Sequence, residues 1–226
     1  LRTVCAARAH DALAVAVGHA GGSGGRDDED SPVSLLEAAG EVARFLEGQG
    51  VRYAIIGGLA LQHWGEVRLT RDIDVTVLVE PERLAGFVDA VLGRFRPRMP
   101  DAREFALTHR VLLIETTEGI PVDISLGIPG YEEEALQRAV SVEFPGAGPL
   151  RLLAPEDLII HKCVAGRPRD REDVEGVLVR QQLKLDLSLI RRWLQAFREI
   201  VEGRDPLQMF EDAVERARQA LQQGGT

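Results

Sequence analysis

Two aspartates separated by one residue are the first feature of the sequence that could carry chemistry. Asp72 and Asp74 stand at the start of a β-branched run, residues 73–79, that predicts a strand. Because side chains on a strand alternate between its faces, these two carboxylates point the same way. They repel each other unless a cation lies between them, and hard oxygen ligands of this kind suit Mg²⁺. The spacing therefore predicts a Mg²⁺ site at the beginning of this strand.

Two adjacent glycines, Gly57 and Gly58, lie upstream of the aspartates, where a predicted buried strand over residues 51–56 ends. Neither residue carries a Cβ, so the backbone at this turn can come close to a phosphate. Mg²⁺ usually completes its coordination shell with water and substrate phosphate. The glycine pair and the aspartate pair together predict phosphoryl or nucleotidyl transfer.

A third aspartate, Asp123, lies in an alternating segment further along the chain. Val122 and Ile124 can face a core, which turns Asp123 to the opposite face of its strand. If this strand pairs beside the one that carries Asp74, three carboxylates converge. Two of them can hold the metal that neutralises a triphosphate, and the third can take a proton from an attacking hydroxyl. An Asp-x-Asp pair alone is often only surface charge, so the glycines and Asp123 are what favour a metal site.

Hydrophobic periodicity and turn residues predict the elements that must position these side chains. A helix starts at Ser31-Pro32 and ends before Gly48, and a turn at Glu118-Gly119 predicts a hairpin. The other predicted elements of the first part are a short helix up to Trp64, a helix over residues 81–92, hairpin strands at 109–116 and 120–125, and extended pieces within 141–153. The predicted helices after Pro155 span residues 156–164, 169–181, 187–200 and 207–221.

Composition excludes several classes of protein. The apolar and charged fractions of the 226 residues are those of an ordinary soluble globular protein, with room for one core and a smaller second domain. No apolar run reaches the roughly 18 residues that span a bilayer, so no membrane association is expected. The net charge of −9 does not favour nucleic-acid binding by the surface as a whole, although basic and acidic residues balance within residues 151–226. Cys5 and Cys163 form no zinc spacing, which indicates a reducing, cytoplasmic setting.

The first 30 residues differ from the rest. An Ala/Val-rich piece leads into a Gly/Ser run at residues 21–25 and an acidic run at 27–30. Asp11 interrupts the apolar stretch and no clear cleavage site follows, so a signal peptide is not expected. We interpret residues 1–30 as a disordered or flexible extension.

Two groups of residues resemble a known superfamily. Gly57-Gly58, the run Arg71-Asp72-Ile73-Asp74 and the later Asp123 resemble the polymerase-β-type nucleotidyltransferases. The helical segment 155–162, followed by residues 166–170 and Asp173, resembles the bacterial AbiEii-type toxin nucleotidyltransferases. The similarity covers roughly residues 33–180. It implies an α+β fold, in which a small mixed β-sheet nucleotidyltransferase core flanked by helices (residues 31–153) is followed by a C-terminal helical domain (residues 154–226).

The resemblance also implies roles for individual residues. Gly57 and Gly58 would hold the triphosphate, although many relatives carry Ser at the second position and this chain offers only its backbone N–H there. Asp72, Asp74 and Asp123 would bind Mg²⁺, with Asp123 also assisting deprotonation. The residues expected near the nucleotide are Lys162, Arg71 and the acidic Asp170 or Asp173. The choice between the last two stays open, and Arg71 could equally pair with its neighbouring aspartates.

The leading hypothesis is an Mg²⁺-dependent enzyme that moves a nucleoside monophosphate from an NTP to an acceptor hydroxyl. The toxin-like segment favours tRNA or protein as the acceptor over a small molecule, and implies a cognate antitoxin as a partner. Two alternatives stay open. One is a glycosyltransferase with an Asp-x-Asp motif, which does not explain the glycines or Asp123 and predicts a larger Rossmann-like domain. The other is a nucleotidyltransferase-fold protein that only binds a partner, which would not need three carboxylates.

Overall fold

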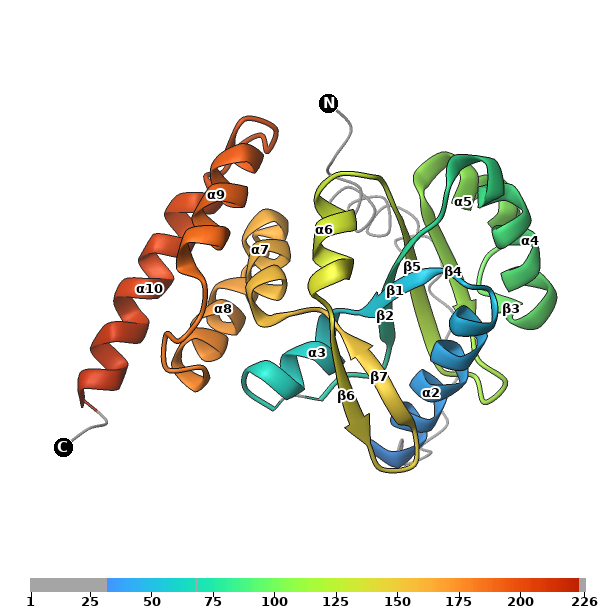
Figure 1. Ribbon diagram of the computed structural model, residues 1–226, viewed down its shortest axis with the longest axis horizontal. Helices are drawn as coiled ribbons and strands as arrows, with labels where there is room; N and C mark the ends of the chain where they lie inside the picture. The colour runs from blue at the N-terminus through green and yellow to red at the C-terminus, as the bar shows by residue number, and fades with distance from the viewer. Residues whose placement is uncertain (1–31, 68, 224–226) are drawn as a thin grey trace. The chain divides into compact units, whose positions relative to one another are not determined.

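A computed structural model describes residues 32–67 and 69–223 of the chain (Figure 1). The chain divides into two compact units. One unit holds the described residues as far as Ile56 together with Thr70–Leu152, and the other holds Gly57–Leu69 and the chain from Leu153 onward. The extension expected over residues 1–30 lies outside the described residues.

The first unit is built on a mixed sheet of seven strands in the order β3-β4-β5-β2-β1-β7-β6. Its centre is the parallel pair β2–β5, and β4–β5, β1–β2, β3–β4 and β6–β7 are antiparallel. The strands are β1 (Arg52–Ile55), β2 (Ile73–Leu78), β3 (Arg96–Pro97), β4 (Val111–Glu115), β5 (Pro121–Gly127), β6 (Val140–Phe144) and β7 (Gly148–Leu152).

One face of the central strands is wholly apolar. In β2 and β5 the alternate residues of this face are buried, and the register of the two strands places them side by side. These residues are Ile73, Val75, Val77, Val122, Ile124 and Leu126. The opposite face of the same two strands carries Asp74, Thr76, Asp123 and Ser125. Burying aliphatic side chains on the first face fixes the strand register, and the register fixes which polar residues meet on the second.

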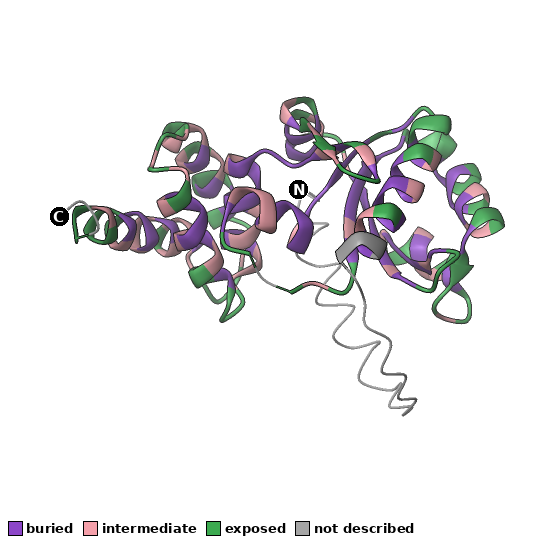
Figure 2. Cartoon of the chain, turned by 90° about the horizontal axis from the view of Figure 1, so that it is seen from below, coloured by how far each residue is buried: buried purple, intermediate pink, exposed green. Residues whose placement is uncertain are grey.

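Helices cover this sheet, and buried residues run through the strands and along the inward sides of the helices (Figure 2). Helix α2 packs against β1 and β7, α6 packs against β1 and β2, and α5 packs against β4. The helices of the first unit are α2 (Pro32–Gly48), the 3₁₀ turn η1 (Pro81–Arg83), α4 (Leu84–Arg94), α5 (Ala102–His109) and α6 (Tyr131–Arg138).

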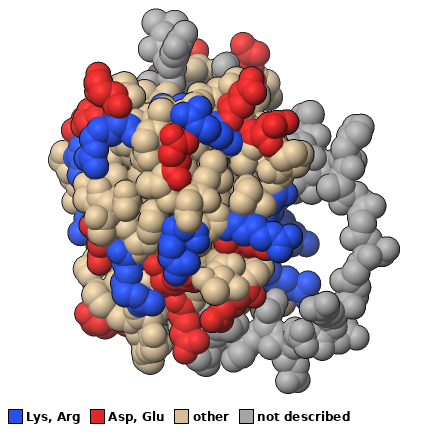
Figure 3. Space-filling view, turned by 90° about the vertical axis from the view of Figure 1, so that its right-hand side faces the viewer, with Lys and Arg blue, Asp and Glu red and all other residues tan. Residues whose placement is uncertain are grey.

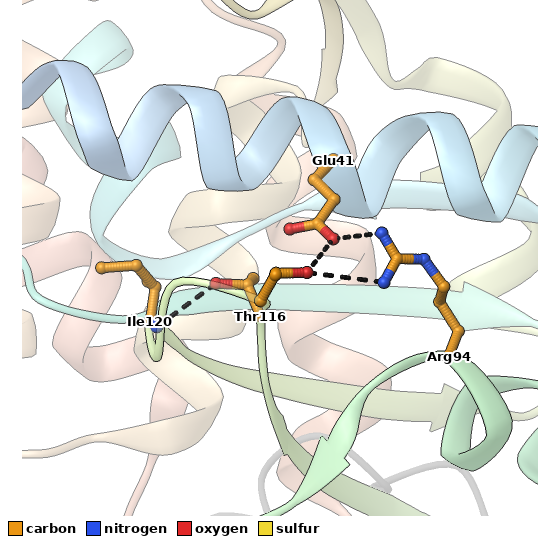
Figure 4. A network of polar contacts seen from close by, with 5 residues as sticks. Glu41, Arg94, Thr116 and Ile120 are labelled. Carbon is orange, nitrogen blue, oxygen red and sulfur yellow. Dashed lines mark hydrogen bonds and ion pairs between the residues drawn. The ribbon is translucent and has the colours of Figure 1, made fainter.

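A polar network ties α2, α4 and the β4–β5 turn together (Figure 4). Glu41 of α2 accepts hydrogen bonds from Arg94 Nη2 at 2.6 Å and from Thr117 Oγ1 at 2.9 Å. Within the turn, Ile120 N donates to Thr116 Oγ1 at 3.2 Å. The hairpin predicted at residues 118–119 is confirmed, and this network holds its turn against α2.

The second unit is helical. It consists of α3 (Gly57–Trp64), α7 (Pro155–Ala165), α8 (Asp170–Arg180), α9 (Leu187–Arg198) and α10 (Pro206–Gln223). Trp64 Nε1 donates to Leu153 O at 2.8 Å, and Arg180 Nη1 donates to Gly65 O at 2.7 Å. These bonds fasten the end of α3 to the C-terminal helices. Residues 57–69, which the sequence analysis placed in the core domain, therefore group with the helical part.

Three short elements were not predicted. Helix α5 ends at His109, where a strand was expected to begin; Arg110 takes a left-handed conformation with φ of 62°, and β4 starts only afterwards. Helix α6 begins at Tyr131 after Gly130, and three successive glutamates complete its first turn. The strand β3 has two residues, too few for any alternation to appear in the sequence.

The pieces expected within residues 141–153 form the β6–β7 hairpin. None of the helices in the described part of the chain combines the length and apolar character that crossing a bilayer requires.

Glu132 is a buried carboxylate on α6, with only 3% of its surface exposed. Among the described residues its Oε2 has no hydrogen-bond partner. Gly127 leaves it room, since a Cβ there would lie 3.4 Å from Glu132 Cβ and 2.9 Å from Val77 O. Burial raises the pKa of Glu132 to about 7, against the opposing effects of its own backbone N–H and the charge of Arg110.

We predict that this carboxylate makes the fold less stable as pH rises. Its folded pKa of about 7 exceeds the ordinary 4.5, so the folded chain binds more protons than the unfolded chain between these pH values. The free energy of unfolding therefore falls through that window, by about 3 kcal/mol for this one group. Glu132→Gln should remove the loss, gaining stability over the wild type from pH 5 to pH 8 in urea titrations. Glu134→Gln, exposed on the same helix, is the control, and parallel pH profiles of the two variants would contradict the prediction.

Candidate functional site

The parallel pairing of β2 with β5 brings Asp74 and Asp123 together. The two residues are Cα partners in adjacent strands. Their neighbours Ile73 and Val122 are also partners and are fully buried on the opposite face, so both carboxylates lie on the same side of the sheet. Asp123 is only 8% exposed, whereas Asp74 is half-buried. The condition set by the sequence, that the two strands lie side by side, is met.

Asp72 lies one residue before β2 and is exposed. Its Oδ1 accepts a hydrogen bond from Thr70 Oγ1 at 2.8 Å. Its negative charge contributes to raising the pKa of Asp123, which places the two carboxylates within electrostatic reach of each other. Arg71, beside it, is exposed.

Arg98 is the residue of this site that sequence reasoning missed. Its Nη1 lies 2.5 Å from Asp123 Oδ1, in a charge-assisted hydrogen bond. Burial raises the pKa of Asp123, the guanidinium of Arg98 opposes that shift, and the charge of Asp72 adds to it. Arg98 follows the two-residue strand β3, so neither hydrophobic alternation nor a motif marks it in the sequence.

The residue types at this edge fit a divalent cation. Carboxylate oxygens are the ligands that Mg²⁺, Ca²⁺ and Mn²⁺ prefer, and one or two are usual for Mg²⁺ that also binds phosphate. Within residues 32–67 and 69–223, no three His, Cys, Asp or Glu side chains are gathered closely enough to enclose a metal ion by themselves. Asp123 is turned to Arg98 and Asp72 to Thr70. The arrangement thus offers an in-register carboxylate pair with a third carboxylate nearby.

The glycine pair begins α3 in the second unit. Gly57 has φ of 58°, a left-handed conformation that residues with a Cβ rarely adopt, and Gly58 is buried. The residue before them, Ile56, donates its N–H to Asp74 O at 2.8 Å. The chain therefore leaves β1 beside Asp74, and the turn that follows requires glycine at its first position.

Lys162 of α7 forms a buried ion triad with α8 in the second unit. Its Nζ lies 2.9 Å from Asp170 Oδ1 and 2.6 Å from Asp173 Oδ2. The three side chains are 13%, 4% and 9% exposed. Asp170 also accepts a hydrogen bond from Arg167 N at 2.9 Å. The sequence left the choice between the two aspartates open, and the structure places both against the lysine.

Several solved structures are similar in fold to this chain. An antigenic nucleotidyltransferase-like protein from Paracoccidioides brasiliensis matches 81% of this chain and 88% of its own, with a TM-score of 0.53 and 16% identity. Two structures of the antibiotic-resistance factor ANT(2'')-Ia, one in complex with adenylyl-2''-tobramycin, match 75% and 74% of the chain and 94% and 97% of their own. Their TM-scores are 0.45 and 0.44, at 17% identity. The first of these likenesses confirms the predicted fold class.

No curated protein matches the sequence. A family model described as a nucleotidyltransferase of unknown function, DUF6036, matches residues 34–205. That range runs from α2 to the loop before α10 and includes every candidate residue described above. The AbiEii-type toxins, to which the segment around Lys162 was likened, are not the family that matches. The chain belongs to the DUF6036 family of nucleotidyltransferases.

Proposed function

We propose that the chain is a Mg²⁺-dependent enzyme that transfers a nucleoside monophosphate from an NTP to an acceptor hydroxyl. The observation that carries the proposal is the register of β2 and β5, which makes Asp74 and Asp123 partners on one face of the sheet. Membership of a nucleotidyltransferase family supports the reaction class. The carboxylate pair alone would not identify the reaction, because many hydrolases and transferases place two carboxylates at a metal site.

In this proposal Asp72, Asp74 and Asp123 would hold the cation. When bound, Mg²⁺ supplies Lewis-acid stabilisation of the charge that develops on the transferring phosphate. Asp74 and Asp123 fix the site from two neighbouring strands, and Asp72 extends it from the turn before β2. Asp123 also accepts the proton of the attacking hydroxyl.

The NTP's phosphates would contact the glycine turn and two basic side chains, Arg71 and Lys162. Gly57 and Gly58 present backbone N–H groups at the start of α3, and helix N-termini favour anions. Arg71 lies next to Asp72 and is exposed, so it can reach a phosphate. Lys162 would contact a phosphate oxygen by giving up its ion pair with either Asp170 or Asp173.

The acceptor class that we propose is tRNA or protein, with the chain acting as the toxin of a toxin–antitoxin pair in the cytoplasm. Support for this part comes from the segment around Lys162. The face that carries α4 and α5 shows interspersed basic and acidic side chains (Figure 3). Pairs such as Arg96–Glu115 and Arg103–Asp89 account for part of that mixture. This face therefore does not favour a polyanion, and a tRNA acceptor would have to bind elsewhere.

The two alternative functions are less well supported. A glycosyltransferase with an Asp-x-Asp motif would need a larger Rossmann-like domain, whereas this sheet is mixed and β1–β2 and β4–β5 are antiparallel. A purely partner-binding protein would gain nothing from placing two carboxylates in register, since like charges on paired strands are destabilising.

We predict that Asp74→Asn and Asp123→Asn each lower nucleotide transfer by about a hundredfold or more, because each removes a ligand of the metal that stabilises the transition state. Transfer is measured with each of the four radiolabelled NTPs, with Mg²⁺ or EDTA, onto total RNA and onto lysate protein. Asp89→Asn, at an exposed ion pair, is the control. Transfer that survives EDTA or either active-site variant would contradict the proposal.

Lys162 needs a test that separates nucleotide binding from folding. Lys162→Met leaves two nearly buried aspartates without their cation, so it should lower the free energy of unfolding by about 3 kcal/mol. Lys162→Arg keeps the charge. At a temperature where all variants are folded, we expect Lys162→Met to weaken NTP binding by about tenfold to a hundredfold.

Lys184→Met, at an exposed lysine, should change neither quantity. NTP affinity measured by isothermal titration, beside urea unfolding, distinguishes the two roles. A variant that loses stability but binds NTP like the wild type would make Lys162 a structural residue only.

The toxin role predicts growth arrest. Controlled expression of the chain in a bacterial host should stop growth, and Asp74→Asn should relieve the arrest because transfer is lost. Protein levels compared by immunoblot exclude poor expression of the variant. Arrest by both proteins, or by neither, would remove the toxin role and leave the transferase proposal standing.

A further inference from the structure

Arg98 holds the carboxylate on which the proposed site depends. The pair is largely screened from water, since the side chains of Arg98 and Asp123 are 28% and 10% exposed. A charge-assisted hydrogen bond in such surroundings is among the stronger polar contacts in proteins. Any cation that binds Asp123 must therefore contend with a guanidinium that already lies 2.5 Å from it.

The sheet lines these groups up in one row. Arg98 N donates to Leu113 O at 3.0 Å, Leu113 is the partner of Asp123, and Asp123 is the partner of Asp74. With strands about 4.8 Å apart, the backbone of Arg98 lies about 10 Å from that of Asp123, and its side chain reaches across the Leu113 position. Asp123 thus has a cation on one side and a like-charged carboxylate on the other.

This row explains why Asp123 pairs with Arg98. Turning Asp123 toward Asp74 without a cation would bring two negative charges together and leave Arg98 unpaired. A divalent cation between Asp74 and Asp123 removes the first penalty and competes with Arg98 for the same oxygen. The carboxylate of Asp123 therefore has two alternative partners on opposite sides.

We propose that Arg98 and the divalent cation compete for Asp123, so that Arg98 weakens metal binding and leaves Asp123 when the cation binds. The inference rests on the proposed function, because it takes Asp74 and Asp123 as cation ligands. It makes Arg98 a positioning residue that sets the metal affinity of the site.

The test is direct titration of the full chain, without nucleotide, with Mn²⁺ as the probe and free Mn²⁺ followed by electron paramagnetic resonance. Arg98→Gln should bind Mn²⁺ about tenfold more tightly than the wild type, because a unit charge that competes for the ligand is gone. Arg98→Lys should fall between the two, since one ammonium replaces a planar fork. If Arg98→Gln does not fold, the Mn²⁺ affinity of Arg98→Lys serves as the test instead.

Two controls separate competition from general charge. Arg96→Gln removes an arginine two residues earlier, whose side chain is 80% exposed and pairs with Glu115 at 3.1 Å, and should leave Mn²⁺ affinity unchanged. In an Asp123→Asn background, Arg98→Gln should give no gain, because the contested ligand is absent. A gain that persists in that background would overturn the inference.

The remaining outcomes are distinct. Equal or weaker Mn²⁺ binding by both Arg98 variants overturns the competition and leaves the proposed transferase untouched. Absence of Mn²⁺ binding by every protein overturns the competition and the metal dependence together. Tighter binding by Arg98→Gln in a chain that transfers no nucleotide supports the competition and overturns only the proposed reaction.

Discussion

The structure depends on the parallel pairing of β2 with β5. Aliphatic residues on one face fix that register, and the register then forces Asp74 and Asp123 together on the other. Two carboxylates so placed repel each other, and a half-buried sheet offers little water to screen them. Arg98, on the other side of β4, offsets this repulsion by pairing with Asp123. A stable apolar face and a charged polar face are thus two consequences of a single pairing.

Much of this fold could be predicted from the sequence because its elements carry strong local signals. The helices after Pro155 and the hairpin around residues 118–119 follow from periodicity and turn residues. Helices α5 and α6 were missed because each has eight residues, which gives periodicity little length in which to appear. The grouping of α3 with the C-terminal helices depends on long-range hydrogen bonds from Trp64 and Arg180, which no local pattern encodes.

The candidate site divides in the same way. Asp72, Asp74 and Asp123 could be predicted as site residues, because the Asp-x-Asp spacing and the apolar alternation around Asp123 are visible in the sequence. Arg98 could not, since it lies two strands away from Asp123 and follows a strand of only two residues, which leaves no pattern in the sequence. The triad of Lys162 was visible as a motif, but its ion pairs with both aspartates are a matter of how α7 meets α8. The residue types and their spacing could thus be read from the sequence, whereas the ion-pair partners of the charged side chains could not.

The most direct test of the central claim is a crystal structure of the chain grown with Mn²⁺ and a non-hydrolysable NTP, with anomalous scattering collected to locate the metal. We predict an anomalous peak bonded to carboxylate oxygens of both Asp74 and Asp123, with the guanidinium of Arg98 no longer within hydrogen-bonding distance of Asp123. A metal bound elsewhere, or bound while the Arg98–Asp123 pair stays intact, would contradict it.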